Sequence, residues 1–228
     1  MDYLINSLNA ALTMILHMDQ EVLSAVSTSL FTSFTAILIA AVFGIPFGAA
    51  IGMWQFPGKR LTVTLLNTLM ALPTVVVGLL LFGLFSRQGP LGPLGLLFTP
   101  WAMIAGQVVL AVPIVANYTL AAVAGADQRI LPTAITLGAG RLRGSWQLLL
   151  EVRFGVMAAI VAGFGRVIAE VGVAMMLGGN IRGSTRTMTT AIALETSKGE
   201  FAFGLALGIV LMSVALIINL FLNMMQQR

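Results

Sequence analysis

Residues 24–53 read SAVSTSLFTSFTAILIAAVFGIPFGAAIGM and contain no charged side chain. About 20 apolar residues in a helix are enough to cross the roughly 30 Å hydrocarbon layer of a bilayer. This stretch is therefore long enough to span a membrane, and the turn WQFPGKR at residues 54–60 ends it. The run is continuous and lacks the apolar-polar alternation of barrel strands, which favours a helical bundle over a transmembrane barrel.

The rest of the chain repeats this pattern. Of its 228 residues, 58% are hydrophobic and only 9% are charged, which is too little polar surface to cover a soluble globule of this size. Further apolar runs predict spans at about residues 61–85, 101–124, 154–177 and 201–225. The sequence therefore predicts an all-α, polytopic membrane protein with five transmembrane helices in one domain over residues 1–228.

Residues 1–23 differ from these runs because they carry Asp2, His17 and Asp19. We predict that this segment lies at the membrane interface or packs as a short helix, and a sixth span is the alternative. It has no basic n-region and no clear small-residue cleavage site, so a cleaved signal peptide is not expected. The absence of cysteine excludes disulfides and a thiolate metal site.

The loop charges predict an orientation. With five spans and the N-terminus outside, the cytoplasmic side receives seven basic residues, namely Lys59, Arg60, Arg129, Arg141, Arg143, Arg153 and Arg228. The outside receives four, namely Arg87, Arg182, Arg186 and Lys198. This excess agrees with the positive-inside rule. Pro46, Pro73 and Pro113 fall inside three successive predicted spans, where they indicate bends that either surround a pathway or reflect ordinary membrane-helix packing.

The loop at residues 127–153, DQRILPTAITLGAGRLRGSWQLLLEVR, holds a dense group of arginines between two apolar runs. Pro132 suits the first turn of a short helix, and Gly138 and Gly140 allow the turn that ends it. A second, amphipathic segment follows. From the residues alone, this helix-turn-helix either docks onto a cytoplasmic protein or lies against lipid headgroups, with Trp146 at the membrane interface.

This loop resembles the EAA loop of ABC importer permeases, which docks into the cytoplasmic ATPase. Aligned on TLGA at residues 136–139, Gly138 takes the motif glycine, while Pro132 replaces the usual glutamate and Glu151 the usual proline. The resemblance implies an ATPase-coupling loop made of Pro132, Ala134, Leu137, Gly138, Ala139, Gly140, Arg141, Leu142, Trp146 and Leu150.

Residues 163–192, GFGRVIAEVGVAMMLGGNIRGSTRTMTTAI, resemble molybdate, tungstate and sulfate permeases, and the run RVIAEVGVAMMLGGNIRG is most similar to tungstate permeases of the Tup type. The resemblance implies a type I ABC importer permease fold in the cytoplasmic (inner) membrane. The implied activity is import of a tetrahedral oxyanion, tungstate first and molybdate, sulfate or phosphate as alternatives. It also implies a second copy of the chain, ABC ATPase subunits carrying ATP and Mg²⁺, and an extracytoplasmic oxyanion-binding protein.

Arg166 and Glu170 stand four residues apart in the fourth predicted span and are expected to pair, because an unpaired charge there is costly. Gly155, Ala159 and Gly163 precede them at helical spacing, so this face should contact protein. The pair either moderates the potential felt by a passing dianion or braces helices. The loop at residues 178–190, GGNIRGSTRTMTT, carries hydroxyl and guanidinium groups that suit an oxyanion gate. Together with the span pair, the path or gate candidates are Arg166, Glu170, Asn180, Arg182, Ser184, Thr185, Arg186 and Thr187.

Other polar residues within spans, Asn67, Gln107, Asn117 and Tyr118, are interpreted as interhelical hydrogen-bond partners. An enzyme is the rival class, but His17 is the only histidine and no G-x-S-x-G or H-E-x-x-H occurs. No G-x-x-x-x-G-K-[ST] occurs either. We therefore predict a transport subunit without catalytic residues, metal ligands or a bound cofactor. Its surroundings are the lipid bilayer and protein partners, with no nucleic acid.

Overall fold

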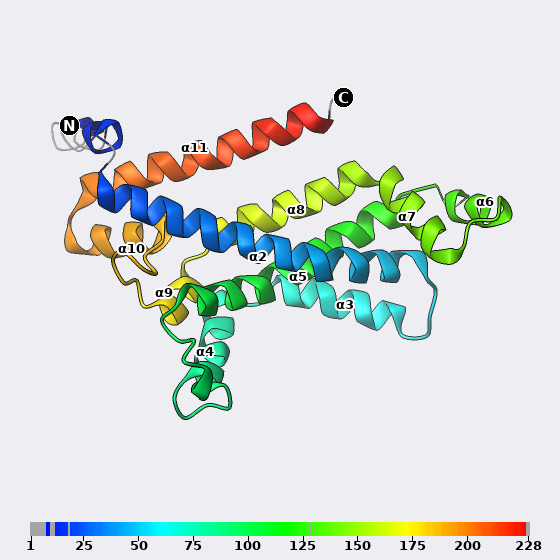
Figure 1. Cartoon of the computed structure of the whole chain (residues 1–228), viewed down its shortest axis with the longest axis horizontal. Coiled ribbons are helices and arrows are strands. Elements are labelled where there is room, and N and C mark those ends of the chain that lie inside the picture. The colour runs from blue at the N-terminus through cyan, green and yellow to red at the C-terminus, as the bar shows by residue number, and fades with distance from the viewer. Residues whose placement is uncertain (1–7, 10–11, 18, 128, 227–228) are drawn as a thin grey trace.

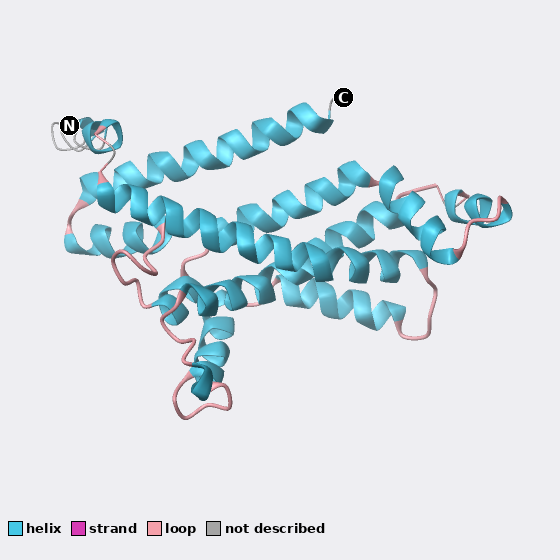
Figure 2. Ribbon diagram, in the orientation of Figure 1, coloured by secondary structure: helices cyan, strands magenta, loops and turns pink. Residues whose placement is uncertain are grey.

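The computed structural model describes residues 8–9, 12–17, 19–127 and 129–226, and within these residues it contains helices, turns and loops but no strand (Figure 2). The all-α prediction is confirmed. The helices are α2 (Gln20–Met53), α3 (Lys59–Met70), α4 (Thr74–Phe85), η1 (Gly92–Leu94), α5 (Pro100–Ala124), α6 (Ile130–Thr136), α7 (Arg141–Glu151), α8 (Arg153–Ile168), α9 (Gly172–Gly178), α10 (Met188–Lys198) and α11 (Phe201–Gln226).

Helix α2 begins four residues before the predicted start of the first span. The Asp19 carboxylate accepts hydrogen bonds from the backbone N–H groups of Glu21 and Val22 at 2.8 and 3.4 Å, which caps the helix. The 34 residues of α2 have a length of about 51 Å at the usual rise per residue. Because this exceeds the roughly 30 Å hydrocarbon layer, α2 must tilt or extend beyond it.

The centre of the fold is the contact of α2, α5 and α8. A Cβ on Gly48 of α2 would lie 2.1 Å from the Ala116 carbonyl oxygen of α5, and a Cβ on Gly163 of α8 would lie 2.6 Å from Ile37 Cδ1 of α2. Glycine therefore sets the closest approach of these helices. The small-residue face expected on the fourth span does contact protein. Buried residues around it include Ile37, Ala111, Val115, Phe164 and Val167.

The second predicted span is divided into two helices. Instead of one helix over residues 61–85, α3 and α4 meet at 93°. Pro73 is the residue that precedes α4, and it has extended backbone angles. Proline lacks an N–H donor and disfavours helical geometry in the residue before it. By contrast, Pro46 and Pro113 lie inside α2 and α5 without ending them.

The fourth predicted span, 154–177, is also divided. Helix α8 ends at Ile168 and α9 begins at Gly172, so Glu170 lies in the break rather than in a helix. At its other end, α8 meets α7 at 71°. Among the described residues, three helices are long and apolar enough to cross a membrane, at Gln20–Met53, Pro100–Ala124 and Phe201–Ile218. The total becomes five if each bent pair forms one span.

Figure 1 shows α6 and α7 at one end of the molecule and α10, with the first turns of α2 and α11, at the other. Lys59 and Arg153 are the first residues of α3 and α8, and both helices begin at the α6–α7 end (Figure 1). Six of the seven predicted cytoplasmic basic residues are described, and they thus share one end of the molecule. Residues 12–16 of the N-terminal segment are helical, whereas Asp2 and Arg228 lie outside the described residues.

Candidate functional site

The predicted coupling loop is a helix, a glycine turn and a helix. Pro132 lies in the first turn of α6, and α6 ends before Leu137. Gly138 has a φ of +90°, in the left-handed region that favours glycine. The Ala139 N–H donates to the Ala134 carbonyl at 2.9 Å, which closes the turn. Gly140, with ordinary extended angles, precedes α7.

This loop has one anchored side and one exposed side. Leu148 of α7 is buried with Ala49 of α2 and Val123 of α5. On the exposed side, the fractional exposures are 83% for Leu137, 89% for Leu142 and 64% for Trp146. Because α6 also packs against α7, the exposed apolar side chains are connected to the central helices through α7. Of the remaining predicted loop residues, Arg141 and Leu150 are exposed, and Ala134 and Ala139 are half-buried.

An ion pair stands at the start of the loop. Arg129 Nη2 lies 3.1 Å from Asp127 Oδ2, and the Arg129 backbone N–H donates to Asp127 Oδ1 at 2.9 Å. The Arg129 side chain and then this backbone bond lower the pKa of Asp127 below its ordinary value. Asp127 is therefore ionised at neutral pH, and the loop begins with a neutralised pair.

The predicted pair of Arg166 and Glu170 exists, with 2.6 Å between Arg166 Nη1 and Glu170 Oε2. Glu170 is buried, and its other carboxylate oxygen accepts the Val173 N–H at 3.1 Å. The Thr189 hydroxyl donates to the Glu170 carbonyl at 2.8 Å. Residue 170 thus connects α8, α9 and α10 across the break between α8 and α9, which favours the bracing interpretation of the pair.

Replacing Glu170 with glutamine is expected to reduce the stability of the detergent-solubilised chain by about 1–3 kcal/mol. The amide oxygen can still accept the Val173 N–H, but it cannot neutralise Arg166. Thermal unfolding of the two proteins measures the effect. An unchanged melting temperature would contradict the brace and favour the alternative, in which the pair moderates the potential felt by a passing dianion.

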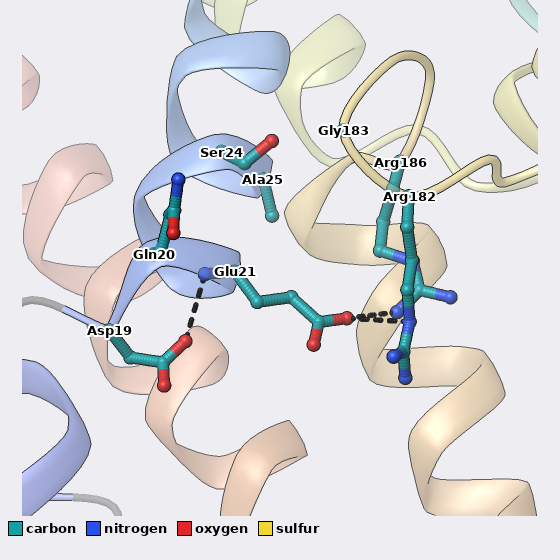
Figure 3. A pocket seen from close by; sticks show the side chains of 8 residues that line it. All are labelled: Asp19, Gln20, Glu21, Ser24, Ala25, Arg182, Gly183 and Arg186. Carbon is teal, nitrogen blue, oxygen red and sulfur yellow. Dashed lines mark hydrogen bonds and ion pairs between the residues drawn. The ribbon is translucent and has the colours of Figure 1, made fainter.

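At the opposite end, Arg182 and Arg186 line a cavity of about 450 Å³ together with the first turns of α2 (Figure 3). Glu21 Oε1 accepts from Arg182 Nε at 3.0 Å and from Arg186 Nη1. Glu195 of α10 lies 3.2 Å from Arg186 Nη1 and 3.1 Å from Lys198 Nζ. The Arg182 side chain is 63% exposed, but that of Arg186 is only 7% exposed. Both predicted gate arginines are therefore engaged by carboxylates.

Most of the other gate candidates make hydrogen bonds that hold the segment between α9 and α10 in its conformation. The Thr185 hydroxyl bonds the Gly178 carbonyl and the Ile181 N–H, and Thr187 caps α10 by a bond from the Thr190 N–H at 3.2 Å. Asn180 has a φ of +52° and its Oδ1 accepts from the Thr190 hydroxyl at 2.9 Å. Ser184 is exposed.

Sequence reasoning missed Glu21 and Glu195 as partners of the gate arginines. Glu21 precedes Arg186 by 165 positions, so no local spacing relates the two. A second long-range bond, from the Met188 N–H to Ser29 Oγ at 2.8 Å, also fixes α10 to α2. The only local signal was an acidic residue at the start of the first apolar run.

The interhelical interpretation of two other polar residues is confirmed, since Asn117 Nδ2 donates to Asn67 Oδ1 at 2.7 Å.

These features define a class: a multi-pass helical membrane subunit with a helix-turn-helix loop that exposes apolar side chains at one end and an ionic cluster at the other. Residues 44–228 match the family described as the binding-protein-dependent transport system inner membrane component. The chain belongs to this family and is a permease subunit of the ABC transporter type.

Two tungstate uptake system permease proteins, both named TupB, are similar along nearly the whole chain. The one from Campylobacter jejuni is 38% identical over 219 residues, covering 96% of this chain and 92% of the relative. The one from Peptoclostridium acidaminophilum is 37% identical over 227 residues and covers 100% of both. A bacterial ABC transporter that imports alginate gives a TM-score of 0.65 at 18% identity, over 96% of this chain and 83% of the other, which supports the type I importer fold.

Proposed function

We propose that this chain is the membrane-spanning subunit of a tungstate importer. In this proposal two copies form the pathway, separate ATPase subunits bind ATP and Mg²⁺ and hydrolyse the nucleotide, and an extracytoplasmic binding protein delivers the oxyanion. The observation that carries the proposal is the α6–Gly138–α7 loop, with its apolar side chains exposed at the end of the molecule where the basic loops gather. The two tungstate permeases among the relatives support the substrate.

In this proposal the loop transmits the movement of the ATPase to the membrane helices. An ATPase that binds Leu137, Leu142 and Trp146 would move α6 and α7 as one body, because the two helices pack together. Leu148 connects α7 to α2 and α5. The break between α3 and α4 and the break between α8 and α9 are places where such a displacement changes backbone angles without unfolding long helices. Alternating access then requires no chemistry in this subunit.

Molybdate and sulfate are the alternative substrates, since both are tetrahedral dianions like tungstate. Neutral hydroxyl and amide donors can bind all three oxyanions. In this proposal the permease therefore discriminates little between them, and the binding protein provides most of the substrate selectivity. The near-complete length of the match to tungstate permeases is the reason to place tungstate first.

The test is reconstitution of the chain with its ATPase subunit in proteoliposomes, followed by ATP-dependent uptake with the binding protein loaded with tungstate, molybdate or sulfate. We expect co-purification of chain and ATPase, and uptake that is fastest for tungstate. Uptake of molybdate or sulfate with no uptake of tungstate would contradict the substrate. A chain that moves oxyanion without ATP, or that binds no ATPase, would contradict the coupling role.

A further inference from the structure

Helix α3 differs from its neighbours because it carries two strips of opposite character. Arg60, Thr64, Asn67 and Thr68 follow one another at helical spacing and share one face. Leu61, Leu65 and Leu69 recur every four residues on the adjacent face. All seven residues are exposed. The remaining face packs Val63 and Leu66 against Ile51 of α2 and Ala116 of α5.

Helix α5 extends the polar strip beyond α3. Asn117 Nδ2 donates to Asn67 Oδ1 at 2.7 Å, and it also lies 2.8 Å from Met70 Sδ. Tyr118, the next residue, is exposed although most of α5 is buried. Amide groups from two helices thus meet beside an apolar interface between α2, α3 and α5.

Contact with lipid explains only part of this strip. The hydroxyls of Thr64 and Thr68 each donate to the carbonyl four residues earlier at 2.9 Å, which would suit hydrocarbon. The Asn67 amide is different, because its oxygen accepts from Asn117 and its nitrogen belongs to an exposed side chain. Helices α3 and α4 are together long and apolar enough to enter the membrane as a broken span or a re-entrant loop. Exposed polar groups at membrane depth normally face water or protein.

We propose that Thr64, Asn67 and Thr68 of α3, with Asn117 and Tyr118 of α5, line the oxyanion path on the cytoplasmic side of the bend at Pro73. This inference deepens the proposed function and rests on it. Neutral donors bind a dianion weakly enough to release it. Arg60, near the start of α3, provides a favourable potential where the path reaches the basic end of the molecule. The leucine strip faces apolar surroundings.

The first experiment uses the fact that the natural sequence has no cysteine. Single cysteines replace Thr64 or Thr68 on the polar strip and Leu65 or Leu69 on the leucine strip, in the complex with its ATPase. A charged, membrane-impermeant thiosulfonate is applied to inside-out vesicles. We expect labelling of T64C and T68C to be about tenfold faster or more than that of L65C and L69C, because a thiol in hydrocarbon is neither hydrated nor ionised. Equal rates on both strips, or faster labelling of the leucine positions, would overturn the proposal.

The second experiment separates a path residue from a structural one. In Asn67→Asp the carboxylate still accepts the Asn117 N–H, so the interhelical bond is kept, but a negative charge now faces the dianion. We expect uptake to fall about tenfold or more from like-charge repulsion in a partly dry channel, with Asn67→Gln much less affected and thermal unfolding unchanged. Wild-type uptake by Asn67→Asp would overturn the inference. If the unmodified complex transports no oxyanion at all, the proposed function fails instead, whatever the labelling pattern.

Discussion

Replacing Gly138 with valine should reduce ATP-driven oxyanion uptake about 10- to 100-fold while the chain stays folded in the membrane. The φ of +90° at this residue lies where a β-branched side chain is strained, at a cost of about 1–3 kcal/mol. A Cβ built there meets no atom within 4 Å, so the strain is confined to the backbone of the turn. We expect the turn to relieve the strain by opening, which displaces α6 from α7 and disrupts the surface that we propose binds the ATPase. Uptake into proteoliposomes and co-purification with the ATPase measure the two consequences.

Gly140 provides a matched control two residues away. Its backbone angles are ordinary, at φ −65° and ψ 159°, and a Cβ there also meets nothing within 4 Å. Gly140→Val should therefore retain most of the uptake. Asparagine tolerates the left-handed region better than other non-glycine residues, so Gly138→Asn should transport better than Gly138→Val. Equal losses in the valine variants at 138 and 140 would argue against the turn as the cause.

Replacing Arg186 with methionine should lower the stability of the purified chain by about 3–5 kcal/mol, as expected when one partner of a buried ion pair is removed. The substitution keeps much of the side-chain volume but leaves the buried Glu195 without its 3.2 Å contact to the guanidinium. Glu21 also loses a partner and keeps its contact with Arg182 Nε at 3.0 Å, so the contact between α2 and the segment before α10 is weakened. Thermal unfolding in detergent, followed by light scattering and by intrinsic fluorescence, measures the loss.

Arg182→Met is the control for this variant, because Arg182 contacts the same two carboxylates but is 63% exposed. Its loss should be about 0–1 kcal/mol, as for other solvated ion pairs. The double variant Arg186→Met, Glu195→Met removes both buried charges and should recover part of the stability lost in the single variant. If Arg186→Met and Arg182→Met unfold at the same temperature, burial does not determine the strength of this cluster.

Local signals located several parts of the molecule correctly. Continuous apolar runs gave the helices, because burying apolar side chains in lipid needs no knowledge of their neighbours. Gly138 marked its turn because only glycine enters the left-handed region at little cost. The basic residues assigned to one side of the membrane, as far as the structure describes them, lie at one end of the molecule, and the orientation itself stays a prediction. The docking role of Leu142 and Trp146 stays a prediction, although both are exposed as it requires.

Other features had no local signal. Residues 154–177 are apolar enough to be taken for one helix, but the chain breaks at Glu170, where tertiary bonds from Thr189 and to Val173 replace helical ones. Pro73 was recognised as a bend but not as the end of a helix, because Pro46 and Pro113 have similar surroundings in sequence and stay helical. Whether a proline ends a helix or only bends it depends on how the neighbouring helices pack around it in the folded structure.

The sequence by itself determined the class of the fold, the approximate membrane spans and the position of the loop between them, because hydropathy and glycine geometry act over a few residues. Only the tertiary structure decided which polar and charged side chains contact one another. Arg186 contacts Glu21 and Glu195, and Asn67 meets Asn117, across separations in sequence of 165, 9 and 50 residues. The identity of a distant partner follows from packing in three dimensions rather than from periodicity.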